Sequence, residues 1–129
     1  MKSRDNAVRL KRFQIDDKSR QVGQIETMIE EFSRMIADLD QEIEAEHRRT
    51  GIDDEKHFAY STFARAAIQR RANLQTSVAD LQSQLTTAMA ALDLAQAELA
   101  RDEERIDRDS VISSDRRVGG RRATDRAQP

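Results

Sequence analysis

The residues most able to do chemistry in this chain are few and widely spaced. Glu44 and His47 stand three positions apart, a spacing that puts a carboxylate and an imidazole on one helical face, as in di-iron bundles. Such a centre needs two copies of the pattern and two further glutamates. The chain has one copy, and its other histidine, His57, falls in a predicted loop. We therefore expect His47 to be a solvated side chain and predict no metal site.

The other chemical motifs are also incomplete. Gly119 and Gly120 are flanked by arginine pairs but lack the Gly-Lys-Ser/Thr sequence of a phosphate-binding loop. The chain has no cysteine, which excludes disulfides and thiol nucleophiles and is compatible with the cytosol. No Ser-His-Asp arrangement and no cleft are indicated. The sequence thus predicts a protein that is not an enzyme and holds no cofactor.

Apolar residues repeat with a period of seven in the first third of the chain. One set consists of Val8, Ile15, Val22, Ile29, Ile36 and Ile43. A second set, apolar in the middle and charged at its ends, consists of Lys11, Lys18, Ile25, Phe32, Leu39 and Glu46. A later register advances in steps of four and three: Leu74, Val78, Leu81, Leu85, Ala88, Leu92, Ala95 and Leu99. Because such stripes must be covered by another helix, the sequence predicts two seams of one coiled coil.

The expected fold class is all-α, a long antiparallel two-helix coiled-coil hairpin with a disordered C-terminal tail. Thr50 and Gly51 are suited to ending the first helix, and Ser61 or Thr62 to capping the second. The predicted segments are a hairpin over 1–108, with a helix over about 4–49, a loop over 50–61 and a helix over about 62–108, and an arginine-rich disordered tail over 109–129. No apolar run approaches the roughly 20 residues that span a bilayer, so we expect a cytoplasmic protein.

The charge distribution favours an antiparallel arrangement. Residues 1–20 carry seven Lys and Arg against three acids, whereas residues 21–60 carry four against eleven. If the chain folds back on itself, residue i meets roughly residue 111 − i, which sets basic residues 9–12 beside the acidic residues 102–107. A parallel dimer would instead stack the acidic stretch against its own copy. The sequence therefore predicts a hairpin that is a monomer when free.

Two groups of apolar residues lie outside the predicted seams. Leu10 and Phe13 face away from Val8 and are surrounded by Arg4, Arg9, Lys11 and Arg12. They form either a docking patch for a partner with an apolar groove and an acidic rim, or two tolerated surface residues. Near the loop stand Ile52, Phe58, Tyr60 and Phe63. These four side chains either plug the end of the core or form a binding surface.

Arginines could serve nucleic-acid binding in two places. The tail carries Arg116, Arg117, Arg121, Arg122 and Arg126. Over residues 110–129 the excess of these arginines over acids is only three, and no aromatic residue is present in the tail for base stacking, so we expect a solvated tail and no nucleic acid. A helical arm that contacts RNA through Arg65, Arg70, Arg71 and the tail is a further alternative.

Two stretches resemble FliJ, the flagellar export protein family, in its alphaproteobacterial form. They are RLKRFQIDDKSRQ (residues 9–21) and HFAYSTFARAAIQRR (residues 57–71). The resemblance covers about residues 1–108. It implies an antiparallel coiled-coil hairpin similar to the central stalk of rotary ATPases, acting in the flagellar type III secretion apparatus.

The resemblance also implies partners. FliJ proteins associate with the hexameric export ATPase FliI, contact the gate protein FlhA and help recycle export chaperones, peripherally at the inner-membrane export apparatus. The residues here that fit the ATPase contact are Arg9, Leu10, Lys11, Arg12 and Phe13. For the gate contact they are Phe63, Gln69, Arg70 and Arg71. The alternative is a generic coiled-coil adaptor or dimerisation rod.

Overall fold

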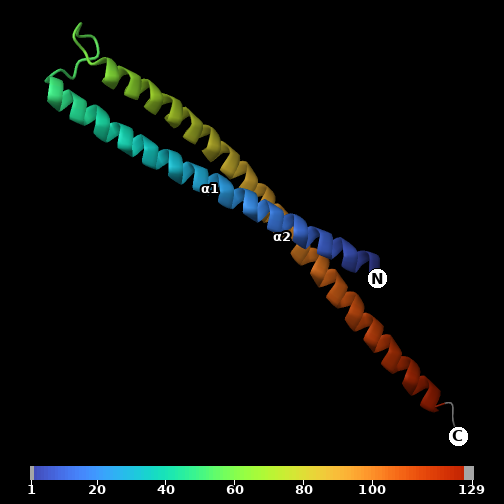
Figure 1. The fold of residues 1–129 in the computed structure, drawn as a ribbon. Coiled ribbons are helices and arrows are strands. Elements are labelled where there is room, and N and C mark those ends of the chain that lie inside the picture. Colours follow the sequence, from blue (N-terminus) through green and yellow to red (C-terminus); the bar gives the residue numbers. More distant parts are fainter. Residues whose placement is uncertain (1, 127–129) are drawn as a thin grey trace. The chain divides into compact units, whose positions relative to one another are not determined.

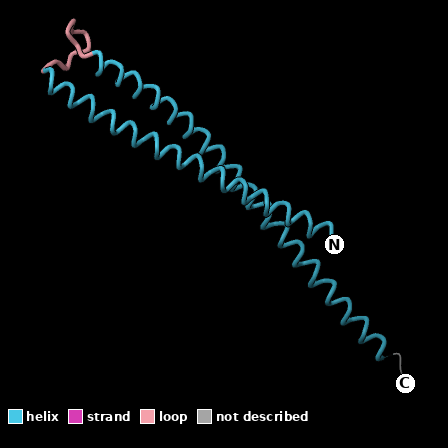
Figure 2. The backbone as a smooth tube through the Cα atoms, in the orientation of Figure 1, coloured by secondary structure: helices cyan, strands magenta, loops and turns pink. Residues whose placement is uncertain are grey.

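The computed structural model describes residues 2–126, with side chains described for residues 3–112. It contains two α-helices, α1 (Lys2–Thr50) and α2 (Thr62–Arg126), joined by the loop 51–61 (Figures 1 and 2). Over residues 2–126 there is no strand. The two helices run antiparallel and pack against each other, so the predicted all-α hairpin is confirmed.

The seam positions predicted from the heptads are those that the hairpin covers. All twelve predicted seam residues of α1, from Val8 to Glu46, are buried or half-buried, and so are the eight of α2 from Leu74 to Leu99. The residues between them are mostly exposed. The helices therefore hold together through the narrow apolar stripes that the sequence sets at heptad spacing.

Local capping explains where the hairpin turns. Gly51 adopts φ 72°, a left-handed conformation that suits glycine, and its N–H donates to the His47 carbonyl at 2.8 Å. At the start of α2, the Ser61 Oγ accepts a hydrogen bond from the Ala64 N–H at 3.1 Å. Of the two caps that the sequence allows, the structure uses Ser61.

α2 extends beyond the predicted end near residue 108. No glycine or proline stands between 108 and Gly119, so no strong helix breaker follows that position. Asp109 also pairs with Arg4, which ties this turn of α2 to α1. The side chains of the tail arginines lie outside the described residues, and the predicted disorder of residues 109–129 stays a prediction.

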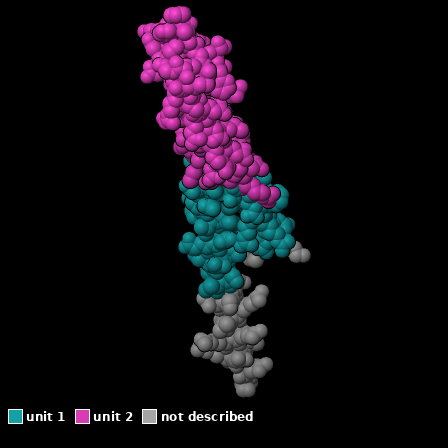
Figure 3. Space-filling model, turned by 60° about the vertical axis from the view of Figure 1, so that its left-hand side comes forward, with its two compact units in different colours: residues 1–19, 90–129 teal, residues 20–89 magenta. Residues whose placement is uncertain are grey.

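The chain divides into two compact units (Figure 3). We call residues 20–89 the loop unit, and residues 1–19 with 90–129 the terminal unit. In the loop unit, Leu39, Ile43 and Ala67 form a buried cluster against which Ile68 and Leu74 pack. This cluster and its extension along the seam form the apolar core of the loop unit.

The terminal unit depends more on charge. Among its described residues Val8 is the one buried hydrophobic side chain. Three ion pairs join its two helix segments, namely Arg4 with Asp109, Lys11 with Asp102, and Arg12 with Glu103. Its other apolar seam residues, such as Ile15, Leu99 and Ile106, are only half-buried, so less apolar surface is buried here than in the loop unit.

Candidate functional site

The most prominent surface feature of the terminal unit is the pair Leu10 and Phe13. α1 brings them to neighbouring positions on the face opposite the Val8 seam, and their side chains are 57% and 65% exposed. Arg9 lies next to Leu10, is exposed, and makes no ion pair with any described residue. These three residues, which we call the outer patch, combine apolar area with an unneutralised cation.

Lys11 and Arg12 do not belong to this outer patch. Lys11 occupies a seam position, is half-buried, and donates a hydrogen bond to the Asp102 carboxylate. Arg12 places Nη2 2.6 Å from the Glu103 carboxylate, with Nε of the same group also donating to it. Two of the three predicted docking cations, Lys11 and Arg12, therefore join α1 to α2. Of the predicted docking residues, Arg9, Leu10 and Phe13 are those that take no part in the ion pairs between α1 and α2.

Lys11 also changes the acidity of its partner. The hydrogen bond from the Lys11 ammonium holds the pKa of Asp102 below its usual value, against a smaller opposing effect of desolvation. Asp102 thus remains ionised to lower pH than a free aspartate. A charged pair at seam positions of both helices, where apolar residues are the rule, fixes which turns of the helices face each other.

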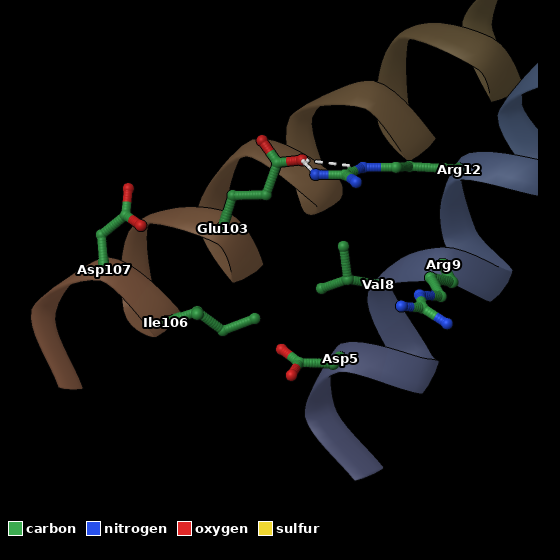
Figure 4. Close-up of a pocket in the computed structure, with 7 residues that line it drawn as sticks. All are labelled: Asp5, Val8, Arg9, Arg12, Glu103, Ile106 and Asp107. Atoms are coloured by element: carbon green, nitrogen blue, oxygen red, sulfur yellow. Dashed lines mark hydrogen bonds and ion pairs between the residues drawn. The ribbon is translucent and has the colours of Figure 1, made fainter. Parts of the chain in front are cut away.

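A shallow groove opens between α1 and α2 in the terminal unit (Figure 4). Val8 and Ile106 point toward each other and form its apolar floor. Its charged rim consists of Asp5, Arg9, Arg12, Glu103 and Asp107. No group of three or more potential metal ligands occurs among the described side chains, so these carboxylates do not make a cation site. The groove has the character of a protein contact, apolar within and charged at its edge.

The predicted gate-contact residues also separate into one that joins the two helices and others that are exposed. Phe63 is 56% exposed and Arg70, seven residues on, shares its face of α2. Gln69 donates to Asn73 at 3.1 Å, and the Arg71 guanidinium lies 2.7 Å from Asp40 on α1. Arg71 is therefore part of the hairpin contact. Phe63, Gln69 and Arg70 remain available on the outer surface of α2.

The two loop aromatics, Tyr60 and Phe58, differ in how far they are buried. Tyr60 is 6% exposed and plugs the end of the loop unit, with its hydroxyl 2.7 Å from His47 Nε2. Phe58 is 96% exposed and stacks on the His57 ring. Tyr60 therefore plugs the end of the core as one interpretation predicted, and Phe58 does not contribute to that plug.

His47 is not the solvated side chain that we expected. It is half-buried, and its ring lies 5.6 Å from that of Tyr60. Glu44, its partner in the Glu-x-x-His pattern, instead pairs with Arg48. No sequence pattern indicates the His47–Tyr60 contact, because Tyr60 reaches His47 only through the path of the loop.

A second contact missed from the sequence fastens the base of the loop. The Ser61 hydroxyl donates to Glu46 Oε1 at 2.9 Å while also capping α2, and Arg49 donates to the same carboxylate. Hydrogen bonds from Arg49 and Ser61 lower the pKa of Glu46. The signal available in advance was Glu46 itself, a charged residue at the last seam position of α1.

The arginines considered for RNA are largely committed within the chain. Arg65 donates to the Glu55 carbonyl at 3.0 Å and lies 5.3 Å above the Tyr60 ring centroid. Arg71 pairs with Asp40. Only Arg70 of the three is left without a partner among the described residues, which weakens the case for an RNA-contacting arm.

Comparison with protein-family models, with curated proteins and with solved structures finds no match to this chain. Within the described residues, neither helix is long and apolar enough to cross a membrane.

Proposed function

We propose that this chain is a stalk-like component of the flagellar type III protein export apparatus, of the FliJ type. In this role it binds and stimulates the hexameric export ATPase FliI, and links that ring to the gate protein FlhA and to export chaperones. It acts in the cytoplasm, peripherally at the inner-membrane export apparatus. The resemblance of residues 9–21 and 57–71 supports the proposal, together with the antiparallel hairpin fold.

The observation that carries the proposal is the outer patch. An exposed Leu10–Phe13 pair beside an unpaired Arg9 suits a partner surface with an apolar groove and an acidic rim. The patch occupies one face of α1, so it is asymmetric about the hairpin axis. Within a ring of six equivalent sites, such a surface contacts different sites differently. Differential contact is sufficient to bias their nucleotide states without any chemistry from the stalk.

The experiment is an ATPase assay with the purified cognate ring. The native chain is expected to raise the hydrolysis rate, and the variant Leu10→Glu/Phe13→Glu to lose most of that stimulation, since two exposed apolar anchors become carboxylates facing an acidic rim. An affinity loss of at least about tenfold is expected for removal of such anchors.

The matched control is Met28→Glu/Met35→Glu, which makes the same chemical change at two exposed apolar positions of α1 in the loop unit. Circular dichroism checks that both variants keep their helicity. Stimulation that persists in the Leu10/Phe13 variant, or is lost equally in both, would reject the outer patch as the ATPase contact.

The second candidate is a coiled-coil adaptor or dimerisation rod. Met28 and Met35 favour it, because they are exposed and seven residues apart, so that they lie on one face of α1 outside the seam. This candidate predicts self-association, whereas the stalk predicts a monomer. Sedimentation velocity over a wide concentration range separates the two.

A further inference from the structure

The loop presents one aromatic side chain almost completely to solvent. Phe58 is 96% exposed, and its ring stacks on His57 with centroids 4.7 Å apart and an interplanar angle of 22°. A phenylalanine exposed to this extent leaves most of its apolar surface in water, at a cost that burial in a partner would recover. We call Phe58 and His57 the loop knob.

The main chain around the knob is held in place by its own hydrogen bonds. The Lys56 N–H donates to Asp54 Oδ1 and the His57 N–H to the Asp54 carbonyl, both at 3.0 Å. After Phe58, the Ala59 N–H donates to His57 Nδ1 at 3.0 Å. Because the loop is already ordered, little conformational entropy remains to be lost when the knob is bound.

Contacts to both helices hold the same loop at its middle and near its end. Arg65 of α2 donates to the Glu55 carbonyl, while the buried Tyr60 bonds to His47 of α1. Phe58 lies between these two anchors in the sequence and shares neither of them. The fold therefore uses Tyr60 to close the core and leaves Phe58 projecting from a fixed base.

The charges of the loop indicate what kind of surface meets the knob. Residues 51–61 hold three carboxylates, of Asp53, Asp54 and Glu55, against the one ammonium of Lys56, a net charge of −2. All four side chains are exposed. An acidic loop attracts a basic surface and is repelled by the anionic face of a membrane.

We propose that the loop knob is a docking site for a protein partner that offers an apolar pocket for Phe58 within a basic rim for Asp53, Asp54 and Glu55. The knob is convex, so its occupant must be concave. A single aromatic anchor in a pocket, surrounded by complementary charges, is the usual form of an energetic hot spot. The proposal is independent of the ATPase contact, because it concerns the loop unit and the outer patch belongs to the terminal unit.

The test uses the full chain carrying the photo-crosslinking amino acid p-benzoylphenylalanine at position 58, expressed in the native cell and irradiated. Position 75 carries the same probe as a control, because Gln75 is an exposed residue of α2 that belongs to no proposed contact. The protein joined through position 58 is identified, purified, and titrated with the unlabelled chain. We expect one protein adduct that is specific to position 58.

Variants then test the stated chemistry of the contact. Phe58→Ser is expected to weaken binding at least about tenfold, and Phe58→Leu by much less. Asp53→Asn/Asp54→Asn/Glu55→Gln, in which the new amide at position 54 keeps an acceptor oxygen for the Lys56 N–H, is expected to weaken binding severalfold and to flatten its dependence on salt. Circular dichroism checks that the variants remain helical.

Four outcomes would overturn the proposal: no adduct specific to position 58, an adduct with lipid, an adduct with a second copy of the chain, or a partner whose affinity is insensitive to the acid-to-amide change. Phe58→Ser is also assayed for stimulation of the ATPase and is expected to retain it. Leu10→Glu/Phe13→Glu is expected to keep the loop partner. Failure of the knob and failure of the stalk function are thereby distinguished.

Discussion

The role of a side chain in this hairpin depends on its position relative to the seam. Leu10, Phe13 and Phe58 are apolar residues outside the seam and are exposed, whereas Lys11 is a charged residue within it and finds a carboxylate. A residue whose type disagrees with its position in the heptad therefore marks either a surface available to a partner or a contact that sets the register. This rule explains why Lys11 and Leu10, adjacent in the sequence, have different roles.

Tyr60 gives a direct optical measure of the loop. It is the only tyrosine, and the chain has no tryptophan. Burial and the nearby charge of Glu55 raise the pKa of its phenol. We expect absorbance titration to give a phenol pKa above the usual value of about 10. Because the folded pKa is the higher one, the stability that this group contributes is fully present below the unfolded pKa and is lost as the pH rises through the folded pKa. A phenol that titrates as in a model peptide would contradict the buried placement.

The stability that Asp102 contributes has the opposite pH dependence, and it changes at acid pH. Its pKa is lowered chiefly by the hydrogen bond from Lys11. The stability it contributes is therefore present above the unfolded pKa of about 4 and is lost as the pH falls through the lower, folded pKa. Denaturant midpoints measured from neutral to acid pH should fall more steeply for the native chain than for Lys11→Met. Lys18→Met, a change at another seam lysine, is the control. Equal slopes in all three proteins would reject the pairing.

At the scale of the elements, the sequence predicts the seams and register well and the loop poorly. The heptads specify which residues of α1 and α2 are covered because helical periodicity acts over many turns. The charge blocks set the register, and Lys11–Asp102 and Asp40–Arg71 lie where residue i meets roughly residue 111 − i. The Tyr60–His47 and Ser61–Glu46 contacts could not be predicted. They depend on the path of the eleven-residue loop, whose sequence has no periodic pattern.

Substitution of Gly23 tests how much the helix propensity of α1 contributes to the stability of the protein. It lies within the helix, and a Cβ built on it meets nothing within 4 Å. Gly23→Ala should therefore stabilise the protein by about 1 kcal/mol, through loss of backbone freedom in the unfolded chain without any new clash. In a chain of this size the melting temperature is expected to rise by about 4 °C. Thermal unfolding followed by circular dichroism measures it, with Ser33→Ala as an exposed control on the same helix. A lower melting temperature would mean that flexibility at this position is needed for the fold.

At the scale of the whole molecule, the two units are stabilised by different forces. The loop unit holds seven of the eight buried hydrophobic residues found among the described side chains, namely Val22, Leu39, Ile43, Tyr60, Ala64, Ala67 and Leu81. The terminal unit holds Val8 and the three ion pairs between α1 and α2. Exposed ion pairs contribute only up to about 1 kcal/mol each and are screened by salt, whereas apolar burial is not screened. The units should therefore differ both in stability and in their response to ionic strength.

Hydrogen exchange followed by mass spectrometry tests this difference. Amides of residues 8–18 should exchange faster than those of residues 36–46, because local opening of the terminal unit exposes little apolar surface. Raising the salt concentration should speed exchange in residues 8–18 and leave residues 36–46 nearly unchanged. A partner that docks on Leu10 and Phe13 should slow exchange in the terminal unit, since binding to the closed form alone stabilises it. Uniform protection in both segments, or protection that is indifferent to salt, would show that the ion pairs do not hold the terminal unit closed.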